Sequence, residues 1–140
     1  MLAALVARAV SRAPAGVRRR ALEAAFDRAR EAFNRGDMEA VFALFSDDVE
    51  YVAPPALHEG PPIHGRDAVL RFWEAQLERF DSSSIENLSI EEDTPGRFVR
   101  RARLRHVPRG AGEPLEYVIL QTTELRRGRV VRQVNELDPG

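Results

Sequence analysis

The sequence contains no cysteine and no lysine, so its 21 basic residues are all arginine. Without cysteine the chain can form no disulfide, no thiolate zinc site and no cysteine nucleophile. Without lysine it can form no Schiff base and cannot carry the phosphate-binding loop that ends in a lysine. A packed core must therefore hold the chain together, and 140 residues with 44% hydrophobic content suit a single domain.

A strong charge of one sign and a long apolar run are also absent. The net charge is −1 although 31% of the residues are charged, and this balance argues against nucleic-acid binding, which requires a basic excess. No apolar segment approaches the roughly 18 residues that cross a membrane. No basic residue precedes the first apolar run, as it would in an export signal. We therefore expect a cytoplasmic protein with no nucleic-acid or membrane partner.

Residues 1–16 are expected to form a helical extension ahead of a single domain over 17–138. Apolar residues recur at helical spacing from Leu2 to Val10, with Arg8 and Arg12 beside them, and Pro14-Ala15-Gly16 ends the pattern. We expect this helix to lie on the domain. The alternative is a short amphipathic helix on a membrane surface.

The order of the predicted elements indicates an α+β fold. Helical periodicity predicts helices over 17–35, 38–45 and 66–80, with a tight corner at Gly36-Asp37. Alternating patterns predict a strand over 47–53 and, after Ser84, four strands joined by turns at 95–96, 108–114 and 127–128. Helices followed by a run of antiparallel strands are typical of α+β domains.

Three stretches together resemble a known family. They are Ala32–Asp37 (AFNRGD), Phe45–Tyr51 (FSDDVEY) and Ile63–Asp67 (IHGRD) ahead of Phe72-Trp73. With the four C-terminal strands, they resemble the SnoaL-like branch of the nuclear transport factor 2-like superfamily over about residues 18–137. The resemblance implies a conical, curved antiparallel sheet wrapped around helices, a pocket inside the cone, and a homodimer formed through the sheet.

The same superfamily includes ketosteroid isomerases, polyketide cyclases, epoxide hydrolases, dehydratases and non-catalytic binding proteins, so the fold does not decide the function. At the positions of the isomerase base, tyrosine and partner acid, this sequence has Ala53, Ala29 and Gln121. Alanine transfers no proton, and glutamine can donate a hydrogen bond but cannot ionise. We therefore do not expect the isomerase mechanism. The penultimate strand also lacks the aspartate of an epoxide-hydrolase arrangement.

Strand alternation predicts which side chains face the inside of the cone. On the last strand the expected inward residues are Val131, Gln133, Asn135 and Leu137. The expected ligand pocket consists of Tyr51, Ala53, Trp73, Arg100, Leu104, Tyr117, Ile119, Gln121, Gln133 and Asn135. A mostly apolar wall with a few convergent polar groups is typical of a small-molecule site. The alternative is a filled cone whose polar groups only satisfy one another.

Two residues on the inner face of the strand around 98–106 are candidates for catalysis or ligand binding. His106 is the one histidine expected to face inward, and it could act as an acid or base near neutral pH. The alternative is a structural or solvated histidine. Arg100 lies between apolar inward positions and must either bind an anionic ligand, pair with Glu136 or another acid, or reach water at the rim.

Three functions follow from these patterns. The first is a domain that binds a small apolar or aromatic molecule without strong catalysis. The second is an isomerase, cyclase, dehydratase or hydrolase acting on a small apolar metabolite, with His106, Tyr51 and Gln121 as candidate catalytic residues. The third is a dimeric interaction module, in which Arg101, Arg103 and Arg105 share the outer face and pair with Glu116 and Glu124. Neither a metal nor another cofactor is expected, since His58 and His64 lie in one loop without zinc-site spacing.

Overall fold

The computed structural model describes residues 15–110 and 112–139, which form three helices and a six-stranded sheet. The helices are α2 (Ala15–Asn34), α3 (Met38–Val41) and α4 (Arg66–Glu78). The strands are β1 (Phe45–Val52), β2 (Ile63–His64), β3 (Phe80–Thr94), β4 (Arg97–Pro108), β5 (Leu115–Arg126) and β6 (Arg129–Leu137). This confirms the predicted α+β fold, and the elements follow in the predicted order except that the short strand β2 was not predicted.

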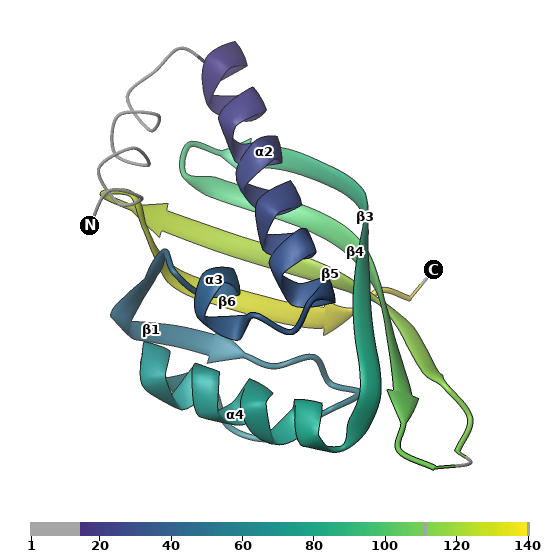
Figure 1. Cartoon of the computed structure of the whole chain (residues 1–140). Coiled ribbons are helices and arrows are strands. Elements are labelled where there is room, and N and C mark those ends of the chain that lie inside the picture. Colours follow the sequence, from purple (N-terminus) through teal and green to yellow (C-terminus); the bar gives the residue numbers. More distant parts are fainter. Residues whose placement is uncertain (1–14, 111, 140) are drawn as a thin grey trace.

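The strands lie in the order β2-β1-β6-β5-β4-β3. The sheet curves strongly, and α2 and α4 lie on its concave side (Figure 1). All neighbouring strands are antiparallel except β1 and β6, which run parallel. The sheet is therefore antiparallel except where β1, the first strand, pairs with β6, the last strand.

The corner between α2 and α3 fixes how α2 crosses the sheet. Gly36 has a φ of 78°, a left-handed conformation that favours glycine. The Asp37 carboxylate accepts a hydrogen bond from the backbone N–H of Ala40 and so caps α3. Asn34 donates to the carbonyl of Ile85 and accepts from its N–H, as a neighbouring strand would. The end of α2 is thereby attached to the middle of β3.

Two helices are shorter than the periodicity predicts. The helix expected over 38–45 ends at Val41, and Phe45 already opens β1. The helix expected over 66–80 ends at Glu78, and Phe80 opens β3, where it pairs with Pro108. Both phenylalanines are buried as expected. Buried apolar residues continue from each helix into the following strand, so the apolar pattern alone predicts an end of the helix that is too late in the sequence.

The inward sides of β1, β4 and β5 are as predicted, but β6 differs at both ends. A register shift in the β5–β6 pairing lies between Glu124 and Leu125 and places Val130 opposite Leu125. Val130 is then the buried residue, in place of Val131, because a bulge reverses the alternation. Leu137 is 53% exposed at the other end. Gln133 and Asn135, in the middle of β6, face inward as predicted.

The helical extension expected over 1–16 lies outside the described residues except for its last two positions, where α2 begins. Its boundary with a domain over 17–138 stays a prediction. None of the helices among residues 15–110 and 112–139 is long and apolar enough to cross a membrane.

Candidate ligand pocket

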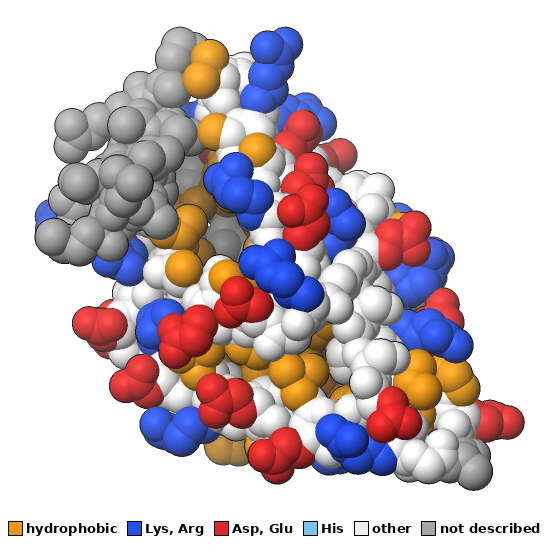
Figure 2. Space-filling view, viewed as in Figure 1, with side chains coloured by type: hydrophobic (Ala, Val, Ile, Leu, Met, Phe, Trp, Pro, Cys, Tyr) orange, Lys and Arg blue, Asp and Glu red, His pale blue; other side chains and the backbone are white. Residues whose placement is uncertain are grey.

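A cavity of about 1110 Å³ lies between the concave face of the sheet, α2 and the segment that links α3 to β1. Pockets for drug-sized molecules occupy about 300–1000 Å³, so this cavity is of ligand size. Its wall is mainly aliphatic and aromatic: Leu22, Phe26, Phe33, Phe42, Leu44, Phe45, Ile85, Phe98, Leu104, Ile119, Leu125 and Val130. Figure 2 shows hydrophobic side chains reaching the surface beside α2, between arginine and carboxylate side chains.

Eight of the ten residues predicted to form the pocket lie in this wall: Tyr51, Trp73, Arg100, Leu104, Ile119, Gln121, Gln133 and Asn135. Ala53 and Tyr117 are buried, but they are not among the described residues that line the cavity. Whether the eight bind a ligand stays a prediction.

A row of polar side chains crosses the concave face. Arg100, Gln121 and Asn135 lie directly opposite one another on β4, β5 and β6. The Gln121 amide donates to Asn135 Oδ1 at 2.9 Å, and the Asn135 amide donates to the carbonyl of Val52 at 2.9 Å. Oε1 of Gln121 is buried and has no hydrogen-bond partner. The row is therefore only partly satisfied, and an unpaired acceptor faces the same side as the cavity.

Tyr51 and Trp73 form a second polar contact in the wall. The Trp73 indole N–H donates to the Tyr51 hydroxyl at 3.0 Å, and both side chains are 2% exposed. Burial raises the pKa of Tyr51 well above its ordinary value. The phenol is therefore neutral near pH 7 and carries no negative charge into the cavity.

Arg100 is 7% exposed, and it neither sits at a rim nor pairs with an acid. One terminal N–H donates to Asn87 Oδ1 at 3.0 Å, and the guanidinium carbon lies 5.0 Å from the centre of the Phe26 ring. Its Nε is buried without a partner. Burial lowers the pKa of Arg100 to about 10, so it remains a cation at neutral pH. The alternative of pairing with Glu136 is wrong, because no carboxylate among the described residues forms an ion pair with this arginine.

His106 is fully buried, but it is not among the described residues that line the cavity. Its Nδ1 lies 2.8 Å from the Ser83 hydroxyl and its Nε2 2.8 Å from the Tyr117 hydroxyl. The ring stacks on Phe80 with 4.7 Å between centroids. Burial, together with the nearby Arg79 cation, lowers the pKa of His106 to about 4. This arrangement matches the structural alternative rather than the catalytic one.

Sequence reasoning missed the contribution of α2. Ala21, Ala25 and Ala29 recur at intervals of four residues, so they share a helix face, and all three line the cavity. A helix that packs small residues toward a sheet leaves space between the two. This alanine pattern was the available signal. Asn87, the partner of Arg100, was also missed, since it lies next to a register shift in the β3–β4 pairing.

The described residues contain no group of three or more histidine, aspartate or glutamate side chains that could hold a metal ion. The cavity wall has only Glu31 as an acid and no histidine among the residues that the structure describes. Its polar groups are thus amides, the Tyr51 and Thr123 hydroxyls, the Trp73 indole N–H, arginines and one carboxylate.

A strongly curved sheet that packs against helices and encloses an apolar cavity gives the chain a cone-shaped α+β architecture. Residues 26–133 match the SnoaL-like domain family. The chain belongs to this family, as the sequence motifs suggested. No curated protein matches the sequence.

Several solved structures share the fold. An NTF2-like protein of unknown function from Burkholderia pseudomallei is 21% identical, with a TM-score of 0.70, and the match covers 83% of this chain and 89% of that one. IdmH from Streptomyces antibioticus, a proposed polyketide cyclase, is 22% identical with a TM-score of 0.66, over 83% and 91%. TerC, co-crystallised with polyporic acid, is 18% identical with a TM-score of 0.67, over 81% and 88%. These likenesses show the fold alone.

Proposed function

We propose that this protein binds a small, largely apolar or aromatic molecule in the cavity under α2. The observation that carries the proposal is the cavity itself, whose volume is about 1110 Å³ and whose wall combines apolar side chains with a few polar groups. A cone filled by its own side chains, the alternative considered above, would leave no such space. Among solved structures of this fold, TerC was co-crystallised with polyporic acid, and this supports a small organic ligand.

Binding is favoured over catalysis by proton transfer. A general base must lie within hydrogen-bond reach of its substrate and have a pKa near the working pH. His106 is buried between Ser83 and Tyr117 with a pKa lowered to about 4, and it does not line the cavity. Glu31 is the one acid among the described lining residues, and it is exposed on α2. The one histidine expected to transfer protons is therefore not placed to act on a ligand in the cavity.

The test uses N-phenyl-1-naphthylamine, a neutral aromatic probe whose fluorescence rises in apolar surroundings. We expect the folded protein to bind it saturably, with one site per chain. Ala29→Trp places an indole in the cavity wall and is expected to lower probe affinity at least about ten-fold. Ala75→Trp, on the exposed side of α4, adds the same ring outside the cavity and is the control. Equal binding to both variants would overturn the proposal.

We also propose that two chains associate through the outer face of the sheet. On this face Arg103 pairs with Glu86 and Glu116, and Arg101 pairs with Asp138 at 2.7 Å. Half-buried Val118 and Leu120 lie on the same face of β5. Charges that are already paired within one chain leave an apolar strip for a second copy to cover. Light scattering at micromolar concentration is expected to give twice the 15.7 kDa chain mass, and a monomer mass would contradict this.

A further inference from the structure

Arg100 is a buried cation whose charge no acid of the described chain neutralises. It is 7% exposed and its Nε has no hydrogen-bond partner. Its polar contact is the neutral amide of Asn87, and its other contact is the ring of Phe26. An uncompensated charge in an apolar setting is costly, and buried charges in proteins are normally paired. The guanidinium therefore has a buried N–H available to donate to an anion.

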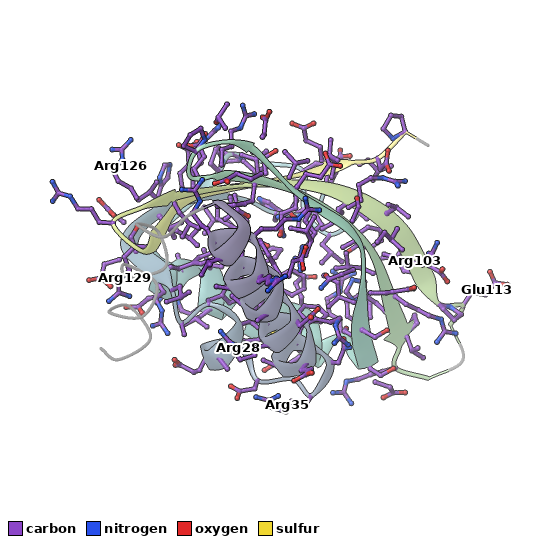
Figure 3. The ribbon with its side chains drawn as sticks, turned by 90° about the horizontal axis from the view of Figure 1, so that it is seen from above. Arg28, Arg35, Arg103, Glu113, Arg126 and Arg129 are labelled. Atoms are coloured by element: carbon purple, nitrogen blue, oxygen red, sulfur yellow. The ribbon has the colours of Figure 1, made fainter. Side chains whose placement is uncertain are left out.

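Most charged side chains that line the cavity have the same sign as Arg100. Its described lining residues include five arginines and one acid, Glu31. The arginines are Arg18, Arg28, Arg35, Arg100 and Arg127. Seen from above, Arg28 lies on α2 and Arg35 just beyond its end, while Arg126 and Arg129 lie on either side of the β5–β6 turn (Figure 3). Two of these arginines pair with acids outside the wall, Arg18 with Glu92 and Arg35 with Asp37. An excess of one sign of charge along a cleft raises the local concentration of ligands of the opposite sign.

The groups beside Arg100 indicate which ligand groups would fit there. Gln121 lies directly opposite Arg100 on β5, and its Oε1 has no partner. An unpaired donor and an unpaired acceptor therefore stand side by side on the wall of the cavity. Tyr51, which is kept neutral by burial, supplies no charge that would repel an anion. A ligand oxygen that accepts from Arg100, next to a hydroxyl that donates to Gln121, would satisfy both groups.

We propose that the ligand is an apolar organic acid whose oxyanion binds Arg100 and whose hydrocarbon part fills the cavity. The inference rests on the proposed binding function and adds the chemical class of the ligand. The anion supplies a partner for the guanidinium, and the contact is a charge-assisted hydrogen bond to a buried group. Such contacts are worth more than neutral ones, and the cost of burying the arginine is already met in the free protein.

The test compares two competitors of nearly equal shape. 2-Naphthoate is an anion and 2-naphthamide is its neutral counterpart, and each displaces N-phenyl-1-naphthylamine from the cavity. We expect the wild-type protein to prefer the naphthoate by about ten-fold or more. Arg100→Met is expected to remove the preference. Arg105→Met, on the outer face of the same strand, is expected to retain it.

The outcomes separate the two proposals. If the neutral probe does not bind, the binding function itself fails. If the probe binds but the two naphthalenes compete equally, or if Arg100→Met keeps the preference, the inference of an acidic ligand is wrong and the binding function stands. A measurement on the wild-type protein keeps the test valid should the variant not fold. The Arg100 Nε–H resonance is expected to shift on addition of 2-naphthoate and not 2-naphthamide, and an unmoved resonance would contradict the contact.

Discussion

Arg100 and His106 lie on the same strand, face the same side of the sheet and are both buried, yet their surroundings are opposite. His106 has a hydroxyl on each ring nitrogen and an aromatic ring stacked on one face. Arg100 lines a cavity, and one of its buried donors has no partner. At the His106 end of β4 the buried polar groups are thus hydrogen-bonded within the protein. At the Arg100 end one buried donor has no partner.

The comparison teaches how to distinguish a structural polar residue from a binding one when both are buried. A buried polar group costs free energy until it is hydrogen-bonded. The protein itself supplies the partners of His106, so substitution there should affect stability. The protein supplies only part of what Arg100 requires, so substitution there should affect binding. Substitutions at the two residues should therefore differ in their effects on the free energy of unfolding and on ligand affinity.

The largest expected effect is on stability at His106. His106→Ala removes a fully buried ring and leaves the hydroxyl of Tyr117 without its partner. Loss of packing and of two hydrogen bonds is expected to lower the free energy of unfolding by about 3 kcal/mol, measured by urea denaturation. The preference for 2-naphthoate over 2-naphthamide should persist in the folded variant. Loss of that preference would show that the two ends of the strand are not independent.

The second prediction concerns the stability of the protein at acidic pH. The pKa of His106 is about 4 in the folded protein and about 6.5 when unfolded, so the unfolded chain binds more protons between these values. The stabilisation from the neutral histidine is therefore complete above pH 6.5 and is lost as the pH falls toward 4. Over that window it amounts to about 3 kcal/mol at most.

The control for this window is the exposed His64. His64→Gln should keep the wild-type dependence of unfolding free energy on pH, measured in urea at each pH. His106→Gln should flatten the dependence between pH 6.5 and 4. Parallel curves for wild type and His106→Gln would mean that burial does not hold this histidine neutral.

At Arg100 the expected stability effect is smaller and has the opposite sign. Arg100→Met keeps the aliphatic packing and removes a buried cation that forms no ion pair with an acid of the described chain. Replacing buried charge with a hydrophobic side chain of similar size is often neutral or stabilising. We expect a gain of about 1 kcal/mol in urea denaturation, with Arg105→Met unchanged as the surface control. A loss of several kcal/mol would show that Arg100 has a structural role like that of His106.

The sequence predicted the difference between these residues only in part. Alternation correctly placed both on the inner face, because side-chain direction in a strand depends only on position. It also predicted seven of the residues that line the cavity, and helical periodicity predicted Trp73. What each inward residue contacts depends on strand register and on the elements opposite. Ser83 meets His106 because β3 begins at Phe80, within the predicted helix, and Asn87 meets Arg100 beside a register shift.

The same limit explains the errors in β6. One register shift in the β5–β6 pairing exchanged Val131 for Val130 as the buried residue. Neither valine carries a sequence signal for this shift, because both favour a strand and both are apolar. The hollow under α2 had a signal in the alanines at 21, 25 and 29, but an alanine face is also typical of close helix packing. Only the separation of α2 from the sheet decides between a cavity and a contact.

The last prediction compares the loss of the hydroxyl group from two buried tyrosines. Tyr117→Phe removes a hydroxyl that pairs with His106, and Tyr51→Phe removes one that pairs with Trp73. Each ring remains, so each variant should lose about 1 kcal/mol of unfolding free energy. Only Tyr51 lines the cavity, and only its loss should change the affinity for N-phenyl-1-naphthylamine or 2-naphthoate. If Tyr117→Phe changes either affinity equally, the site extends to the His106 end of β4, because a hydroxyl outside the wall should not affect the ligand.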